Sequence, residues 1–358
     1  MFIDSKRGAG RYLRRTTTAL GITLAMVTIT LATRANEETS NDVSENWSAP
    51  RTYYGAPDLQ GIWTNATITT LVRPNDADSL VISAEEAKKW EKRQANFIDQ
   101  FDTVAEGDLP AGSDPGGYNA FWIDPGTKMA VLEGEIRTSL IVDPPNGKIP
   151  YRLGAHLKLF EFLRRVGAGF DGPEERPLGE RCIVGFGSTG GPPMLPVLYN
   201  NHYQIVQSRD TVMIHVEMNH DARIIRLNDT HPARHIRKWM GDSIGHWEGD
   251  TLVVETTNFT PGQSYRAAIR HQLYTTEDLK VTERFTRVAE KQIRYEFTMD
   301  DPGAFTRTWR AEMPLNAADG PMYEYACHEG NYALPGILAG ARYDEEKAAK
   351  LADSGGEE

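Results

Sequence analysis

The chain has 358 residues, of which 40% are hydrophobic and 25% charged, and its formal net charge is −11. These fractions are typical of a globular protein and exclude a disordered, a collagen-like or a many-span membrane protein. Residues 1–35 contain six basic residues and one acidic residue, so their removal would change the net charge from −11 to −16. This acidity argues against a nucleic-acid partner, because phosphate backbones are bound by basic surfaces.

The first 35 residues have the organisation of a secretory signal peptide. Basic residues precede an apolar run from Ala19 to Ala32, and Ala35 marks a small-residue cleavage site. The run is short for a membrane span of about 20 apolar residues, although an uncleaved anchor remains the alternative. We therefore expect a periplasmic or secreted protein with no stable membrane span after cleavage, in which residues 36–57 form a flexible leader.

Residues 58–200 are predicted to be loop-rich and partly helical, and to pack on the strand-rich half of the chain. Ser83 and Glu86 form a capping box, which predicts where the first helix begins. The elements predicted here are a first barrel strand at Asp58–Trp63, a helix at Ser83–Phe101, a strand at Arg137–Val142 and a helix at His156–Val166.

From residue 201 to residue 330 the hydrophobic pattern alternates with the period of two that is typical of strands. Eight strands are predicted, at Tyr203–Gln207, Thr211–Met218, Arg223–Leu227, Thr251–Phe259, Leu279–Val288, Gln292–Asp300, Thr306–Met313 and Met322–His328. A helix at Pro232–Met240 interrupts them. We expect a mainly β fold, an eight-stranded antiparallel barrel similar to lipocalins, with a β-sandwich as the alternative. Residues 331–358 are predicted to be an acidic tail with a short frayed helix.

Two cysteines, Cys182 and Cys327, are the only ones in the chain. An even number of cysteines in an exported protein favours a disulfide bond. On the chain-entropy model, closing so long a loop would stabilise the fold by about 4–5 kcal/mol. Two buried free thiols are the alternative.

Three short motifs resemble known sites, but their contexts argue against function. Gly185–Gly190 matches a dinucleotide-binding loop, yet prolines follow it where a helix should begin. Gly241–Gly245 matches a nucleophile elbow, but a predicted helix precedes it and a strand follows, the reverse of that motif. His231 and His235 have the spacing of zinc ligands without a further ligand in the motif. We therefore expect neither an organic cofactor nor a metal.

A cluster of ionisable residues at one strand end is the candidate catalytic centre: His215, Glu217, His220, Asp221 and Arg223. If the strand face carrying His215 points into the barrel, burial would bring the pKa values of the histidine and glutamate toward neutrality. His220 or Glu217 would then act as the base, and Arg223 would hold developing negative charge. If that face points outward, the side chains are merely solvated.

Five further residues are predicted to bind substrate: Asn200, Asn201, Tyr295, Trp309 and Tyr325. The asparagines follow a Gly-rich loop, and the aromatic residues would supply the walls of a pocket. Glu255 and Glu283 lie on largely apolar strand faces, where a carboxylate must be paired or neutralised. Neighbouring arginines are the expected partners, and a polar cavity is the alternative.

Long segments of the chain resemble an uncharacterised family of secreted or periplasmic bacterial proteins. The segments are Pro57–Trp63, Tyr118–Gly126, Arg137–Pro145, Gly179–Cys182, Gly191–Asn201, Gly241–Phe259 and Tyr323–Tyr332. The resemblance implies export but no reaction and no catalytic residues. The residues themselves suggest a secreted, cofactor-independent enzyme that performs elimination, isomerisation or hydrolysis on a small organic molecule or sugar in a barrel cavity. A small-molecule binding protein and a non-catalytic interaction module of the cell envelope are the alternatives.

Overall fold

A computed structural model describes residues 47–99, 124–155, 157–158, 160, 169–185, 191–263, 265–268 and 271–354. The predicted signal peptide, residues 36–46 of the leader, most of the predicted helix at His156–Val166 and most of the 185–190 loop lie outside these residues. Within the described ranges, no helix combines the length and the apolar character needed to span a membrane.

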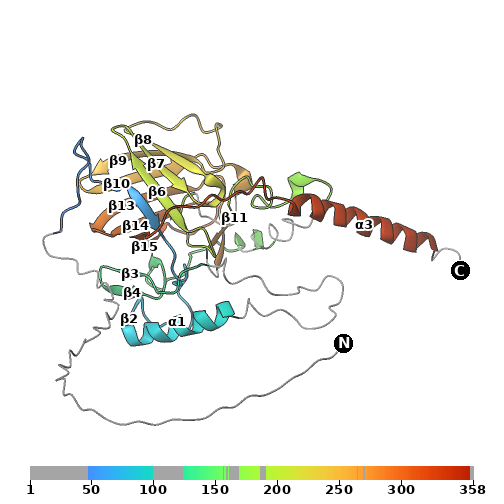
Figure 1. Cartoon of the computed structure of the whole chain (residues 1–358), viewed down its shortest axis with the longest axis horizontal. Helices are drawn as coiled ribbons and strands as arrows, with labels where there is room; N and C mark the ends of the chain where they lie inside the picture. The colour runs from blue at the N-terminus through green and yellow to red at the C-terminus, as the bar shows by residue number, and fades with distance from the viewer. Residues whose placement is uncertain are drawn as a thin grey trace, which may run out of the picture. The chain divides into compact units, whose positions relative to one another are not determined.

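A closed β-barrel forms the centre of the described structure (Figure 1). Its nine described strands, in spatial order, are β1 (Gly61–Thr64), β6 (His202–Gln207), β7 (Thr211–Val216), β8 (Ala222–Leu227), β9 (Asp242–Glu248), β10 (Thr251–Thr257), β13 (Lys280–Ala289), β14 (Gln292–Asp300) and β15 (Trp309–Ala317). Pairing of β15 with β1 closes the circle. All neighbours are antiparallel except β8 and β9. The predicted mainly β barrel is confirmed, with nine strands in place of eight.

The structure contains β9, which was not predicted, and lacks two of the predicted elements. β9 contains Gly245, where any Cβ atom would lie 2.9 Å from Ile225, so this glycine permits close packing rather than a turn. The predicted strand at Met322–His328 has no partner strand and is irregular. The predicted helix at Pro232–Met240 is also wrong. This stretch is irregular with two turns, and Lys238 forms an isolated bridge with Phe259, just after β10.

Smaller elements surround the barrel. The predicted strand at Arg137–Val142 is divided between β4 (Glu135–Arg137) and β5 (Ile141–Asp143), and β5 pairs with β15. The other elements are β2 (Val81–Ile82), β3 (Val131–Leu132), β11 (Tyr265–Ala268), β12 (His271–Tyr274), α1 (Ala84–Asp99), α3 (Ala333–Ser354) and three short 3₁₀ turns at Pro173–Glu175, Met218–His220 and Pro261–Gln263. The tail is therefore a 22-residue helix rather than a short frayed one.

The helix α1 begins as the sequence predicts. The backbone amide of Ser83 donates to Glu86, and the amide of Glu86 donates back to the Ser83 hydroxyl, which completes the capping box. Ala87 and Trp90 pack with Met129 in a satellite cluster beside the small sheet of β2, β4 and β3 (Figure 1).

Aromatic side chains and a polar network occupy the barrel interior. Tyr295 and Trp309, predicted to bind substrate, are 0% and 1% exposed within the main core cluster. Arg223 forms a two-bond ion pair with Glu283, and the Tyr295 hydroxyl donates to the same carboxylate at 2.7 Å. The backbone amide of Met194, in the buried segment 191–197, donates in turn to Tyr295. Glu283 is thus paired as expected, but by a residue predicted to be catalytic.

We expect Arg223→Met to lower the free energy of unfolding by about 3–5 kcal/mol, because it leaves the buried Glu283 carboxylate without a cation. The double variant R223M/E283L should lie closer to the wild type, since it removes both charges. Urea unfolding followed by circular dichroism measures both. Equal destabilisation by the single and double variants would contradict this account of the core.

Candidate functional site

The hairpin of β6 and β7 places a histidine and a glutamate opposite each other at one end of the barrel. Tyr203 pairs with Val216, and both side chains are buried in the core cluster. Successive residues of a strand point to opposite faces, so His202 points to the outer face of β6, and Glu217 directly follows β7 beside it. The Nδ1 atom of His202 is 2.8 Å from Oε2 of Glu217, and the Glu217 amide donates to the His202 carbonyl.

Electrostatics favour the charged form of this pair. The side chain of Glu217 is 4% exposed and that of His202 29%. Burial alone would raise the pKa of Glu217, but the bonds from the His202 ring and the Tyr323 amide outweigh it and lower that pKa. The hydrogen bond to Glu217 raises the pKa of His202 above its usual 6.5, against the effect of desolvation. The two shifts stabilise an imidazolium–carboxylate pair near neutral pH.

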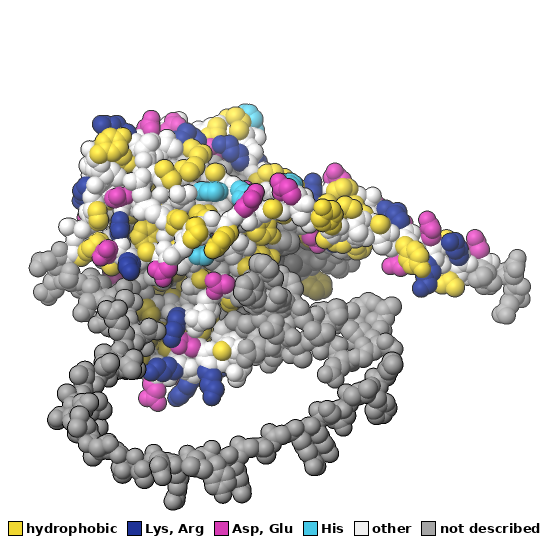
Figure 2. Space-filling view, in the orientation of Figure 1, with side chains coloured by type: hydrophobic (Ala, Val, Ile, Leu, Met, Phe, Trp, Pro, Cys, Tyr) yellow, Lys and Arg dark blue, Asp and Glu magenta, His cyan; other side chains and the backbone are white. Residues whose placement is uncertain are grey.

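The two ring nitrogens of His202 therefore differ in their surroundings. Bonding at Nδ1 orients the ring and directs Nε2 away from the carboxylate. No residue in the described part of the chain hydrogen-bonds to Nε2, and the ring is partly exposed. A histidine that is oriented at one nitrogen and accessible at the other can accept or donate a proton. Figure 2 shows histidine side chains, in cyan, near the middle of the barrel face seen there.

The backbone around the pair is strained. Asn219 and His220, in the turn after Glu217, have φ angles of 60° and 53°, and Asn200 has a φ of 56°. Residues other than glycine rarely adopt this left-handed region, and such residues concentrate at functional sites. Asp221 follows in the same turn, and burial raises the pKa of its carboxyl group to about 7.

The residues predicted to be catalytic lie in three environments. Glu217, His220 and Asp221 are together in the strained turn. His215 is on the outer face of β7, between the buried Ile214 and Val216, so of the two orientations considered the outward one is observed. Arg223 points into the barrel, where it is 3% exposed.

Two of the predicted substrate-binding residues, Asn200 and Asn201, directly precede His202. Asn200 immediately precedes the buried Asn201, whose side chain bonds to both the amide and the carbonyl of Val197 and to the carbonyl of Asp124. Asn201 therefore anchors the end of the segment 191–197 beside the pair, which is a structural contact.

The strand pattern of the sequence does not single out His202, because this residue lies just before the predicted strand Tyr203–Gln207. The register of the hairpin nevertheless predicts which residue lies opposite Glu217. Since the turn at 208–210 is short, Tyr203 faces Val216, and the next position along each strand brings residue 202 opposite Glu217. Any histidine at that position would be a cross-strand partner of the glutamate.

The disulfide Cys182–Cys327 is confirmed, and a pocket of about 300 Å³ lies beside it. The bond joins residues 145 positions apart in the sequence, with their Cα atoms 5.7 Å apart. The pocket is lined by Gly179, Glu180, Cys182, Tyr325, Ala326, Cys327, Gly330, Asn331, Ala333, Leu334 and Ile337. It therefore includes Tyr325, the remaining predicted substrate-binding residue, and the first turns of α3.

The chain segment 323–327 connects the histidine–glutamate pair to the pocket. The amide of Tyr323 lies 3.5 Å from Oε1 of Glu217, and Tyr325 and Cys327 line the pocket. Two residues of extended chain span at most about 7 Å, so the pocket begins close to the pair. A ligand in the pocket would thus lie on the same side of the barrel as His202.

The two weak motifs that the structure describes have structural roles. Ser243, of the elbow-like motif, is 5% exposed and bonds to the hydroxyl of Thr256. Its neighbour Asp242 is buried and accepts bonds from Arg226, His231 and Lys238. Among the described residues, no group of three His, Cys, Asp or Glu side chains is arranged to hold a metal ion.

We expect the stability difference between wild type and Glu217→Gln to depend on pH. The raised pKa of His202 and the lowered pKa of Glu217 mean that the pair contributes fully between the ordinary pKa values of 4.5 and 6.5. Its contribution is lost as the pH rises through the folded-state pKa of His202. The difference should be about 0.5–1 kcal/mol near pH 6 and should shrink toward pH 9. Urea unfolding at several pH values measures it, and a difference independent of pH would contradict the pairing.

Asp221→Asn should stabilise the protein at neutral and higher pH. The carboxyl group has a pKa of about 7 in the fold against its ordinary value of 3.8, so ionisation disfavours the folded state increasingly from about pH 4 to pH 7. We expect the melting temperature of the variant to exceed that of the wild type by about 2–4 °C at pH 8. At pH 3.5 the two should agree, and a gain of the same size there would contradict a buried carboxylate.

The structure thus contains a histidine–glutamate pair at the end of β6, a carboxyl group with a pKa near neutrality in the following turn, and a pocket that segment 323–327 connects to the pair. Comparison of the chain with protein-family models, with curated proteins and with solved structures gives no match in any of the three.

Proposed function

We propose that this protein is an enzyme that transfers protons on a small organic molecule, with His202 as acid and base. The observation that supports the proposal is the His202–Glu217 pair, in which a buried carboxylate orients an accessible imidazole. Groups in this arrangement contribute about 10²–10⁴-fold to proton-transfer rates. Glu217 acts through His202 and is therefore a positioning residue.

The chemistry needs no oxidant or reductant. Neutral His202 takes a proton from a carbon or oxygen atom of the substrate at Nε2, and the electron pair of the broken bond remains on the substrate. The imidazolium is stabilised by Glu217. Return of the proton to another substrate atom gives isomerisation, and its delivery to a departing group gives elimination.

Asp221 is the second ionisable group of the proposed site. Its carboxyl group, with a pKa of about 7, is partly protonated under neutral conditions and could supply a proton while His202 removes one. Arg223 has no part in this proposal, because its guanidinium is bound to Glu283 inside the barrel. The proposed centre thus keeps Glu217 and Asp221 of the predicted cluster and adds His202, whereas the exposed His220 has no part in it.

Location and family remain predictions. The confirmed disulfide is typical of oxidising compartments and supports an extracytoplasmic protein, and we propose export to the periplasm or beyond. The resemblance to the uncharacterised secreted family also stays a prediction.

The test uses 5-nitrobenzisoxazole, whose ring opens when any base removes its C–H proton and which releases a coloured phenolate. We expect His202→Gln to lower the enzymatic rate about 100-fold. Glu217→Gln should move the midpoint of the pH–rate profile to lower pH, because it removes the bond that raises the pKa of His202. A merely structural role for Glu217 would leave that midpoint unchanged.

His246→Gln is the matched control. His246 also contacts a glutamate, Glu248, at 3.2 Å, but both side chains are about half exposed. This variant should retain the wild-type rate. Equal rates for wild type, His202→Gln and His246→Gln would overturn the proposal.

A further inference from the structure

The pocket beside the disulfide has walls from three parts of the chain. The loop 179–182 forms one side, residues 325–331 form the second, and the first turns of α3 form the third. The disulfide bond joins the first two walls directly. Ala333, Leu334 and Ile337 of α3 contribute hydrocarbon surface.

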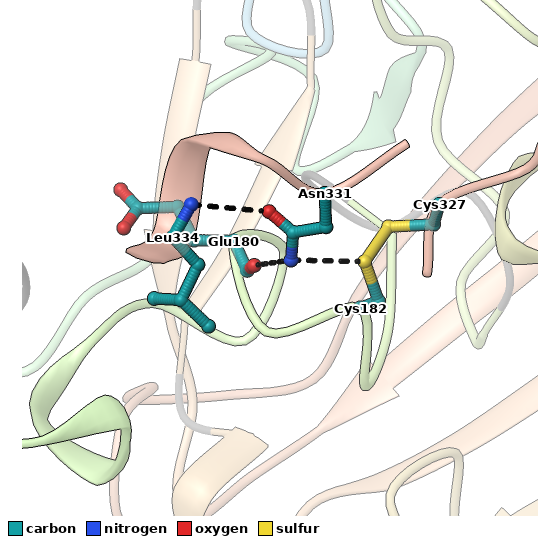
Figure 3. The surroundings of a disulfide bond; sticks show 5 residues. All are labelled: Glu180, Cys182, Cys327, Asn331 and Leu334. Carbon is teal, nitrogen blue, oxygen red and sulfur yellow. Dashed lines mark hydrogen bonds between the residues drawn. A yellow bond between two sulfur atoms is a disulfide. The ribbon is translucent and has the colours of Figure 1, made fainter. Parts of the chain in front are cut away.

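The polar groups of this lining are already used within the protein. Figure 3 shows Asn331 between Glu180 and the disulfide. Its amide nitrogen donates to the carbonyl of Glu180 at 2.7 Å and to Sγ of Cys182 at 3.5 Å, and its oxygen accepts from the amide of Leu334. The carboxylate of Glu180 is held by Arg176 through two bonds of 2.9 and 3.2 Å. The lining side chains thus present mainly hydrocarbon and sulfur to a ligand.

We propose that this pocket binds a compact, uncharged apolar group, with the size of a fused two-ring aromatic system. A cavity of about 150 Å³ holds one benzene molecule, and the volume here, about 300 Å³, is twice that. A charged ligand would gain no charged partner here, because Glu180 and Asn331 are already bonded within the protein. An apolar ligand needs no such partner and gains by burying part of its surface.

The inference deepens the proposed function by naming the class of substrate. If His202 transfers protons, an aromatic or branched aliphatic part of the substrate occupies the pocket, and segment 323–327 lies between it and the reacting atoms. That placement rests on the proposed function. Binding itself rests on the pocket alone and can be measured without turnover.

The test is equilibrium binding of 2-naphthol to the full chain, followed by the fluorescence of the ligand. We expect a Kd of about 0.1 mM for the wild type. Ala333→Phe, which adds a large side chain to the pocket lining, should raise the Kd at least about tenfold. Ala339→Phe is the matched control, because Ala339 is exposed on the same helix but does not line the pocket. It should bind as the wild type does.

Two further variants separate the pocket from the proposed catalysis. His202→Gln should keep the wild-type Kd for 2-naphthol, whereas C182S/C327S should lose binding because the two loop walls are no longer joined. The melting temperature of each variant confirms that it is folded. Absence of binding by the wild type, or equal Kd values for wild type and a folded Ala333→Phe, would overturn the proposed binding site. Neither result would bear on the role of His202, which the elimination assay tests separately.

Discussion

Closure of the sheet through β1 is the constraint on which the rest of the molecule depends. This four-residue strand pairs with both β6 and β15, so every inward side chain is surrounded on all sides. Tyr295, Trp309 and the Arg223–Glu283 pair fill that space together with Met194. Ionisable groups with access to a ligand must then lie at strand ends or on the outer surface, where the His202–Glu217 pair is found.

The sequence predicts the local features of this fold well and the pairings poorly. Strict alternation identifies β6, β7 and β14 almost to the residue, because one face of each strand is buried. Alternation does not predict β9, because a glycine such as Gly245 is typical of a turn. Its close approach to Ile225 is visible only in the structure. The sequence also does not show that Arg223 is the partner of Glu283, because the two residues lie on strands that are not neighbours in the sheet.

The same distinction applies to the candidate site. Glu217, His220 and Asp221 stand out in the sequence as a dense cluster, and the structure keeps them in one turn. Identification of His202 requires the register of a single hairpin, which is formed by residues close together in the sequence. The pocket requires contacts between residues 182 and 327, and a sequence that shows two cysteines does not show which surfaces they enclose.

The disulfide also determines when the site is complete. The segment that Cys327 fastens is the one whose Tyr323 amide reaches Glu217 and whose Tyr325 lines the pocket. A newly made chain in a reducing compartment could close the barrel, yet it would lack the covalent tie that holds this segment in place. If the candidate site acts as proposed, its assembly is coupled to formation of this disulfide, which is typical of oxidising compartments.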